Sequence, residues 1–414
     1  MKRYGCIGKK LTHSFSKEIH GKLADYPYDL IELTEEEIAP FFEKKEFAAI
    51  NVTIPYKQTV IPYLDWISPI ASKVGAVNTI VNKEGKLYGY NTDYHGMKTL
   101  IERVGVDVCG KKVLILGTGG TAKTARAVAT DLGASEIRTV SRREGEDCIT
   151  YEEAVSQHAD AAVILNTTPS GMYPDCTSRP ISVDAFEHLE GVIDAVYNPL
   201  RTNLVLDAKQ KGSKAESGLY MLVMQAVVAV EKFLDTSIPK DAADRVFADV
   251  FAAKENIVLT GMPGSGKSTV GKLLTVDGFE FIDTDEEIEK RCGCPIKDLI
   301  SAKGETYFRD LETEVIRDVS CKGGRIIATG GGAILREENV RALKQNGKLF
   351  FLDAALERLQ ATDSRPLSNT PEKLAKLYAD RIGIYRETAD VTVPDLPAPE
   401  AEAAYILEKR KELI

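Results

Sequence analysis

The chain has 414 residues, too many for one ordinary hydrophobic core, and we expect two or three domains. A net charge of −9 argues against a general nucleic-acid or membrane-surface binder, and 43% hydrophobic with 28% charged residues is ordinary for a globular protein. The seven cysteines lack regular spacing and the first residues lack a signal peptide, so we expect a cytoplasmic protein with reduced thiols.

Short apolar runs alternate with helical patterns along the whole chain, which predicts α/β domains with parallel sheets. Several runs are apolar at nearly every position, as buried parallel strands are. The predicted strands are residues 48–54, 112–117, 136–140, 161–168, 191–197, 256–261, 279–285, 325–331 and 348–353. The predicted helices include residues 121–132, 218–233 and 267–274. Residues 234–256 carry no strand signal, so we place the main domain boundary near residue 250.

Polar clusters that suit a redox site lie in the first hundred residues. They are "THSFS" with Ser14 and Ser16, "NVTIPYKQ" with Thr53 and Lys57, "GAVNT" with Asn78, and "GYNTDYHG" with Thr92 and Asp93. Taken singly, a lysine in a turn is usually a solvated charge, and an aspartate before an aromatic residue is usually a cap or turn residue.

The segment "GTGGTAKT", residues 117–124, follows the strand "KKVLIL" and fits two phosphate-binding patterns. As G-x-G-x-x-A it matches the turn that holds a dinucleotide pyrophosphate. As an ATP loop it fails at Ala122, where the backbone needs a glycine to close around phosphates. The same alanine is acceptable in the dinucleotide turn, where that position packs helix against strand. We therefore predict a dinucleotide turn.

The next strand ends in Ser141, Arg142 and Arg143. A cofactor with a free 2′-hydroxyl would favour an acidic residue there, whereas arginines suit a 2′-phosphate. The alternative is a pair of solvent-facing arginines. The pattern favours NADP over NAD.

Together these clusters resemble shikimate dehydrogenase, and the resemblance continues through "NTTPSGM", "DAVYNPLRTNL" and "SGLYMLVMQA" to about residue 235. It implies that Lys57 and Asp93 are the catalytic pair. It assigns to the substrate Ser14, Ser16, Thr53, Asn78, Asp93, Tyr197 and Gln225. It assigns to NADP Gly117, Gly119, Gly120, Thr121, Ser141, Arg142, Ala195 and Gly218. Lys17 and Gly21 depart from the family's usual proline and asparagine.

The chemistry of this pair is reasonable on physical grounds alone. Hydride delivery to a ketone creates alkoxide character on oxygen, which requires a proton donor within hydrogen-bond reach. Partial burial disfavours a charged ammonium group, whereas a neighbouring carboxylate favours it. We therefore expect Asp93 chiefly to orient Lys57 and the substrate hydroxyl.

The second half begins with a complete P-loop, "GMPGSGKST", between the strand "NIVLT" and a helix. Its glycines let successive backbone N–H groups face phosphates, and the helix N-terminus adds a positive dipole. Lys267 is expected to reach the β- and γ-phosphates and Ser268 to hold Mg²⁺. The ATP-binding residues predicted from this loop are Gly264, Ser265, Gly266, Lys267, Ser268 and Thr269.

Further polar motifs follow the P-loop in a fixed order: "FIDTDEEIE" with Asp283 and Asp285, "YFRDLE" with Arg309 and Glu312, "ATGGGA", "DSRPL" and "RIGIYRETA". Singly they are ordinary caps, turns and surface charges. In this order they resemble shikimate kinase over residues 255–395. The resemblance implies that shikimate is bound by Asp285, Arg309, Gly331 and Arg381, both arginines gripping its carboxylate. It also implies that Asp283 helps Ser268 to hold Mg²⁺, that Arg365 closes onto the phosphates from a lid, and that Lys267 and Asp285 serve catalysis.

The product implied for the first half is the substrate implied for the second, so we expect a bifunctional enzyme that reduces 3-dehydroshikimate with NADPH and phosphorylates shikimate with MgATP. One alternative is a quinate/shikimate dehydrogenase joined to another small-molecule kinase. Another is a sensor that retains both folds without catalysis. The predicted partners are small molecules only, without nucleic acid or membrane. The expected segments are a substrate domain (1–97), an NADP-binding Rossmann domain (98–215), returning helices with a linker (216–250) and a P-loop kinase domain of the nucleoside monophosphate kinase type (251–414).

Overall fold

Most apolar runs of the sequence form buried strands in the computed structural model, which describes residues 3–11, 15–143, 145, 147–276, 278–359 and 370–413. The predicted α/β class with parallel sheets is confirmed. The chain divides into two units, Met1–Val250 and Phe251–Ile414, and the division falls within helix α9 (Lys240–Lys254). Among the described residues no helix is both long and apolar enough to cross a membrane.

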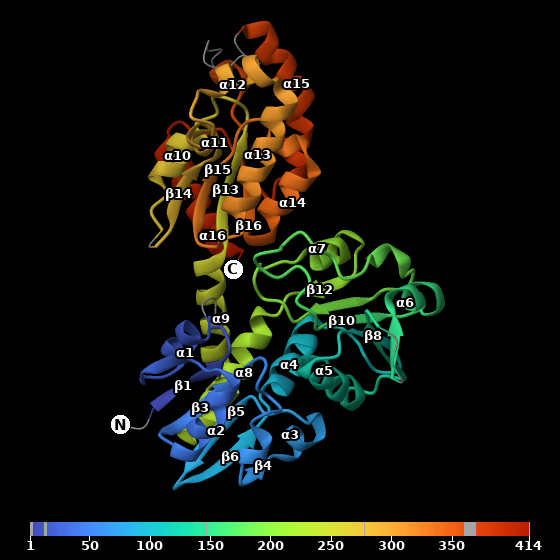
Figure 1. The fold of residues 1–414 in the computed structure, drawn as a ribbon. Helices are drawn as coiled ribbons and strands as arrows, with labels where there is room; N and C mark the ends of the chain where they lie inside the picture. Colours follow the sequence, from blue (N-terminus) through green and yellow to red (C-terminus); the bar gives the residue numbers. More distant parts are fainter. Residues whose placement is uncertain are drawn as a thin grey trace. The chain divides into compact units, whose positions relative to one another are not determined.

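The first unit contains two six-stranded sheets (Figure 1). The first sheet is mixed, with strand order β2-β1-β3-β5-β6-β4. Its strands are β1 (Arg3–Gly8), β2 (Tyr28–Glu32), β3 (Phe47–Val52), β4 (Trp66–Ile67), β5 (Thr79–Lys83) and β6 (Lys86–Tyr90). The associated helices are α1 (Ser16–Leu23), α2 (Glu35–Lys44), α3 (Pro69–Val74) and α4 (Asp93–Val104).

The second sheet of this unit is parallel, with strand order β12-β11-β10-β7-β8-β9. Its strands are β7 (Lys112–Leu116), β8 (Glu136–Ser141), β9 (Cys148–Thr150), β10 (Val163–Asn166), β11 (Gly191–Asp194) and β12 (Lys214–Glu216). Its helices are α5 (Gly120–Asp131), α6 (Tyr151–Gln157) and α7 (Asn203–Gln210). Because the order runs outward in both directions from β7 and β10, the carboxyl ends of these strands form the crevice where a dinucleotide binds in such folds.

Helix α8 (Leu219–Leu234) follows the second sheet but packs against α1, α4, β3 and β5 of the first. Its contact with α4 is close, because Gly96 of α4 lies against the backbone of Met221: a Cβ on Gly96 would lie 2.5 Å from the Met221 carbonyl oxygen. The glycine therefore allows two helix backbones to approach each other.

We predict that Gly96→Ala destabilises the first unit by about 1–3 kcal/mol, because the added methyl group overpacks the α4–α8 contact. Gly21→Ala in α1 is the matched control, since nothing lies within 4 Å of a Cβ there. The chain's single tryptophan is Trp66, so tryptophan fluorescence during urea denaturation reports on the first unit. An equal urea midpoint for both variants would contradict this packing argument.

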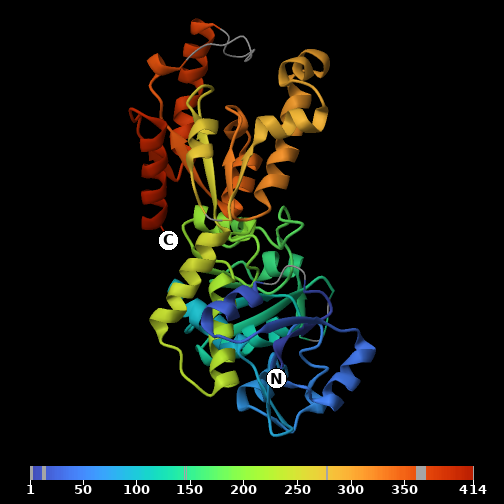
Figure 2. The same ribbon diagram turned by 90° about the vertical axis from the view of Figure 1, so that its left-hand side faces the viewer.

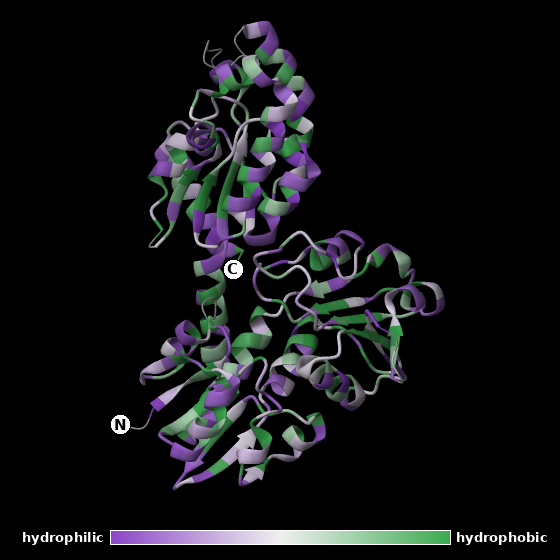
Figure 3. Cartoon of the chain, in the orientation of Figure 1, coloured by the Kyte–Doolittle hydropathy of each residue, from purple (hydrophilic) through white to green (hydrophobic). Residues whose placement is uncertain are grey.

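The second unit is built on a parallel sheet with strand order β14-β15-β13-β16-β17 and helices on both sides of the strands (Figure 2). Hydrophobic residues concentrate on its strands and on those of the first unit (Figure 3). The strands are β13 (Asn256–Gly261), β14 (Glu280–Asp283), β15 (Arg325–Ala328), β16 (Gly347–Leu352) and β17 (Val391–Val393). The helices are α10 (Lys267–Leu273), α11 (Thr284–Cys292), α12 (Ile296–Lys303), α13 (Glu305–Ser320), α14 (Glu337–Asn346), α15 (Pro371–Thr388) and α16 (Pro399–Glu412).

Candidate active sites

Lys57 and Asp93 form a short ion pair in the first unit. Lys57 lies in the turns after β3, and Asp93 is the first residue of α4, shortly after β6. The Lys57 Nζ lies 2.6 Å from the Asp93 Oδ2, and the two side chains are 16% and 11% exposed. A charge-assisted hydrogen bond of this length, largely removed from water, holds the ammonium group in a fixed position. The pair therefore has the geometry of an oriented proton donor.

Thr92 connects two of the predicted substrate-binding residues next to this pair. The Asn78 Nδ2 donates to the Thr92 Oγ1 at 3.0 Å, and the Asn78 Oδ1 accepts from the Thr92 backbone N–H at 2.7 Å. The Thr92 Oγ1 lies 3.5 Å from the Gln225 Oε1 on α8. The structure thus brings Asn78 and Gln225 together beside Asp93. The sequence places Thr92 in a polar cluster that suits a redox site but assigns it no individual role.

Two buried residues that support Asn78 were not singled out from the sequence. Asn51 and Thr79 are directly opposite on the antiparallel strands β3 and β5. The Asn51 Nδ2 donates to the Thr79 Oγ1 at 3.1 Å, and the Thr79 Oγ1 donates to the Asn78 Oδ1 at 3.2 Å. They fix the orientation of the Asn78 amide, because its Oδ1 accepts hydrogen bonds from both the Thr79 hydroxyl and the Thr92 backbone N–H.

The remaining predicted substrate residues lie in different loops of the first unit. Thr53 follows β3, and Ser16 begins α1. Tyr197 follows β11, and its ring contacts that of Phe15 in an edge-on arrangement at 5.2 Å, which places it beside the start of α1. Burial raises the pKa of the Tyr197 hydroxyl, so this group stays protonated. Ser14 lies outside the described residues.

The predicted dinucleotide turn connects β7 to α5. Gly117 has φ = +105°, a conformation that favours glycine, and a Cβ there would lie 2.9 Å from the Thr167 Oγ1. Open space surrounds Gly119, and a Cβ on Gly120 would lie 3.9 Å from the Lys57 Cδ. The start of α5 is thus free to accept a pyrophosphate close to the Lys57–Asp93 pair, and the residues present fit NADP.

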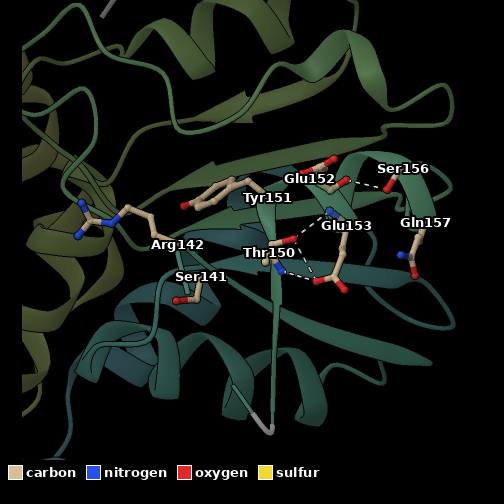
Figure 4. A pocket seen from close by; sticks show the side chains of 8 residues that line it. All are labelled: Ser141, Arg142, Thr150, Tyr151, Glu152, Glu153, Ser156 and Gln157. Atoms are coloured by element: carbon tan, nitrogen blue, oxygen red, sulfur yellow. Dashed lines mark hydrogen bonds between the residues drawn. The ribbon is translucent and has the colours of Figure 1, made fainter. Parts of the chain in front are cut away.

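The other predicted NADP residues occupy two places along the sheet. Gly218 packs directly on the backbone of Ala195, where its N–H donates to the Val196 carbonyl oxygen at 2.8 Å. Ser141 ends β8 and Arg142 follows it, and both line a cavity of about 570 Å³ (Figure 4). That volume is within the usual range of small-molecule sites.

The P-loop of the second unit connects β13 to α10. Gly266 precedes α10 with φ = +88°. The Lys267 side chain is buried, and its Nζ donates to the carbonyl oxygens of Gly261 and Met262 at 2.8 and 2.9 Å. The buried hydroxyl Oγ of Ser265 has no hydrogen-bond partner among the described residues. A buried ammonium group and an unsatisfied hydroxyl beside a helix N-terminus fit bound phosphates.

Ser268 and Asp283 meet at the predicted magnesium position. The Ser268 Oγ donates to the Asp283 Oδ2 at 2.5 Å, and the Asp283 Oδ1 caps α11 by accepting from the Asp285 N–H at 3.0 Å. No cluster of three or more acidic, histidine or cysteine side chains that could hold a metal occurs in the described ranges. This set fits Mg²⁺, because that ion commonly takes one or two protein oxygens and completes its shell with phosphate and water.

A buried carboxyl pair faces the glycines that follow β15. The Asp285 Oδ1 and the Glu312 Oε1 are both buried without a hydrogen-bond partner in the described part of the chain. A Cβ on Gly330 would lie 2.5 Å from the first oxygen and 2.9 Å from the second. Burial, together with the negative charges of Asp283 and Glu312, raises the pKa of Asp285 to about 6. Unsatisfied buried acceptors at one position suit a ligand that carries hydroxyl donors.

Arg309 and Arg381 lie beside these carboxyl groups. The Arg309 Nη1 donates to the Glu312 Oε2 at 2.8 Å, and Gly332 packs directly on the same guanidinium group. Arg381 on α15 is 7% exposed and donates through Nη1 to the Gly331 carbonyl oxygen at 2.8 Å. A buried guanidinium group and a largely buried one suit a carboxylate ligand. Arg365 lies outside the described residues.

Glu312 and Tyr385 are the residues of this site without a predicted role. The Tyr385 hydroxyl lies 2.5 Å from the Gly331 carbonyl oxygen and 2.9 Å from that of Gly261, so it connects the glycine loop with the P-loop. Both could have been inferred from helical spacing, because Glu312 lies three residues after Arg309 and Tyr385 four residues after Arg381.

We predict that Glu312→Gln raises the KM for shikimate about tenfold, because a neutral partner orients Arg309 less firmly toward a carboxylate. Glu314→Gln on the same helix is the control, since that side chain is exposed. Steady-state kinase kinetics at saturating ATP measure the effect. An unchanged KM would show that Glu312 does not position Arg309.

The two units therefore present an oxidoreductase site with a dinucleotide fold and a P-loop kinase site. A family model described as the shikimate dehydrogenase substrate binding domain matches residues 6–80, and one described as shikimate kinase matches residues 263–411. The chain belongs to the shikimate dehydrogenase family and carries a shikimate kinase domain in the same polypeptide. It is thus a bifunctional enzyme of the shikimate pathway, an NADP-dependent oxidoreductase and a kinase that uses ATP and Mg²⁺.

Relatives of the first unit are numerous. The chain is 38% identical over 248 residues to the NADP⁺ shikimate dehydrogenase of Clostridium beijerinckii, covering 91% of that protein and 56% of this chain. It resembles the crystal structure of shikimate dehydrogenase 1 from Peptoclostridium difficile with a TM-score of 0.56, 36% identity, and coverage of 98% of that chain and 60% of this one. The Thermus thermophilus enzyme, crystallised with NADP(H) and shikimate, has a TM-score of 0.55 and 26% identity, with 99% of that chain and 60% of this one covered.

Proposed function

We propose that the first unit reduces 3-dehydroshikimate to shikimate with NADPH, and that the second unit phosphorylates the shikimate 3-hydroxyl with MgATP. The observation that carries the first half is the 2.6 Å Lys57–Asp93 pair beside the dinucleotide turn. The second half is supported by the unsatisfied Asp285 Oδ1, the buried Arg381 and the largely buried Arg309 next to a P-loop. One chain would then catalyse two consecutive reactions.

In the dehydrogenase site Lys57 is the proposed proton donor. NADPH, when bound, supplies the hydride. The Lys57 Nζ holds a proton within hydrogen-bond reach of the substrate oxygen that gains charge, and the Asp93 carboxylate orients Nζ and a substrate hydroxyl. The proposed substrate-binding residues are Ser14, Ser16, Thr53, Asn78, Asp93, Tyr197 and Gln225. The proposed NADP-binding residues are Gly117, Gly119, Gly120, Thr121, Ser141, Arg142, Ala195 and Gly218.

In the kinase site Asp285 is the proposed acceptor of the shikimate hydroxyl proton. Bound MgATP supplies the phosphoryl group, and the metal neutralises charge on its oxygens. Asp285 orients the hydroxyl, Arg309 and Arg381 hold the substrate carboxylate, and Gly331 completes the pocket. Lys267 turns from backbone carbonyls to phosphate, and Ser268 with Asp283 would hold Mg²⁺. Gly264, Ser265, Gly266, Thr269 and Arg365 complete the proposed ATP site.

The proposed division of labour uses four segments, with substrate binding in residues 1–97, NADP binding in 98–215, returning helices and linker in 216–250, and the kinase in 251–414. We propose the cytoplasm as the compartment, because the seven cysteines are free and reduced thiols persist there. The proposed partners are small-molecule substrates alone.

A substrate panel tests the proposed specificity. NADPH oxidation is measured with dehydroshikimate and dehydroquinate, and ADP formation is measured with shikimate, quinate and unrelated hydroxy acids. We expect the highest kcat/KM for dehydroshikimate in the first assay and for shikimate in the second. A preference for another acceptor in the second assay would assign a different kinase activity, and no turnover in either would indicate a binding protein.

A further inference from the structure

The cavity at the end of β8 is built from two neighbouring strands and the helix that follows them. Ser141 pairs with Thr150 in the parallel register of β8 and β9, so α6 begins directly beside the end of β8. The lining residues are Ser141, Arg142, Thr150, Tyr151, Glu152, Glu153, Ser156 and Gln157 (Figure 4). The first residue of α6 therefore faces the position where Ser141 and Arg142 are proposed to hold a 2′-phosphate.

The Glu153 carboxylate and the Arg142 guanidinium group lie at different ends of this cavity. The Glu153 carboxylate accepts from the Thr150 backbone N–H at 2.7 Å and from its hydroxyl at 3.1 Å, and these bonds lower the pKa of Glu153. Figure 4 shows Glu153 directed to the opposite side from Arg142. Arg142 is exposed and makes no ion pair with any described residue. The end of the cavity near Arg142 thus carries a positive charge that an anion can reach.

Tyr151 contributes a hydroxyl donor to the same end. Figure 4 shows its ring extending from α6 toward the side chain of Arg142. The side chain is half-buried, and its hydroxyl makes no hydrogen bond to other residues in the described part of the chain. Burial raises the pKa of Tyr151, with the nearby Arg142 charge acting in the opposite direction. The phenol therefore stays protonated at neutral pH and is free to donate.

We propose that Tyr151 is a specificity-determining residue for NADP, whose hydroxyl donates a hydrogen bond to the 2′-phosphate together with Ser141 and Arg142. This inference rests on the NADP site of the proposed function. A phosphate offers several acceptor oxygens, and a guanidinium group, a hydroxyl and a phenol that line one cavity at the end of β8 and the start of α6 can satisfy more of them than two groups from one loop. NAD(H) lacks this phosphate, so the hydroxyl of Tyr151 has nothing to bind in that cofactor.

The test is Tyr151→Phe in the full-length chain, which removes the hydroxyl and keeps the ring. We expect kcat/KM for NADPH to fall about tenfold and kcat/KM for NADH to stay within about twofold, so that the NADPH preference falls about tenfold. Adenosine 2′-monophosphate should lose a similar factor as an inhibitor, whereas adenosine 5′-monophosphate should not. Kinase activity of the same sample checks its integrity.

Tyr88→Phe in β6 is the matched control, because that half-buried tyrosine belongs to the first sheet. An unchanged cofactor preference in Tyr151→Phe would overturn the inference and leave the proposed function intact. If Tyr151→Phe leaves the preference unchanged and Tyr151→Ala lowers kcat/KM equally for both cofactors, the ring stacks on adenine. That result would also overturn the inference. Equal use of NADPH and NADH by the unchanged enzyme would overturn both the NADP site and the inference.

Discussion

Replacing Lys57 with alanine should lower the turnover of dehydroshikimate reduction by about 10²- to 10⁴-fold, with little change in substrate affinity. The ammonium group is held 2.6 Å from Asp93 and is the proposed source of the proton that the reduced carbonyl oxygen requires. Stopped-flow and steady-state measurements of NADPH oxidation provide the readout. Shikimate phosphorylation should continue at its usual rate, because the kinase site lies in the second unit of the chain.

Lys45→Ala is the matched control for this experiment. Lys45 lies at the end of α2 and makes a longer, more exposed ion pair with Asp65 at 3.8 Å. Its removal should leave both activities within about twofold, because exposed ion pairs contribute little. Near-normal turnover in Lys57→Ala would remove Lys57 from the catalytic role, whatever the behaviour of Asp93.

Replacing Asp285 with asparagine should lower shikimate phosphorylation by at least about 10²-fold and leave NADPH oxidation intact. The asparagine keeps the shape of the side chain but cannot accept a proton. Asp298→Asn in the first turn of α12 is the control, since that carboxylate is exposed. Retention of full kinase activity by Asp285→Asn would exclude Asp285 as the base.

The raised pKa of Asp285 predicts how the kinase activity depends on pH. Burial and the nearby charges of Asp283 and Glu312 raise the pKa of Asp285 to about 6, so the free enzyme carries the protonated, inactive form below that pH. The kcat/KM for shikimate should therefore fall about tenfold per pH unit below pH 6 and level off above it. A profile that is flat between pH 5 and 7 would contradict the assignment of Asp285 as a base with this pKa.

The fold class and both families were predictable from the sequence because long apolar runs and the P-loop are local signals. The runs at 112–117 and 256–261 form β7 and β13 with nearly the predicted bounds. Strands β1, β2, β5, β6, β9 and β12 are absent from the predicted strands. The edge strands β4 and β17 were also missed, since Trp66–Ile67 and Val391–Val393 are too short to show a period. Their strand conformation depends on pairing with β6 and β16, which the local sequence does not specify.

Long-range pairing also explains what sequence analysis missed in the candidate sites. Asn51 and Thr79 support Asn78 only because β3 and β5 pair in one antiparallel register. The cavity beside Arg142 likewise requires β8 and β9 to bring Tyr151 next to Ser141. By contrast, Glu312 is three residues from Arg309 on one helix, so helical spacing already placed it nearby.

If one chain catalyses both reactions, the product of the first must become the substrate of the second. The most direct measurement supplies dehydroshikimate and NADPH to the purified full-length protein, then adds MgATP, and follows both products by liquid chromatography with mass detection. We predict that shikimate accumulates first and is converted to shikimate 3-phosphate once MgATP is present. Shikimate that forms but is never phosphorylated would contradict it.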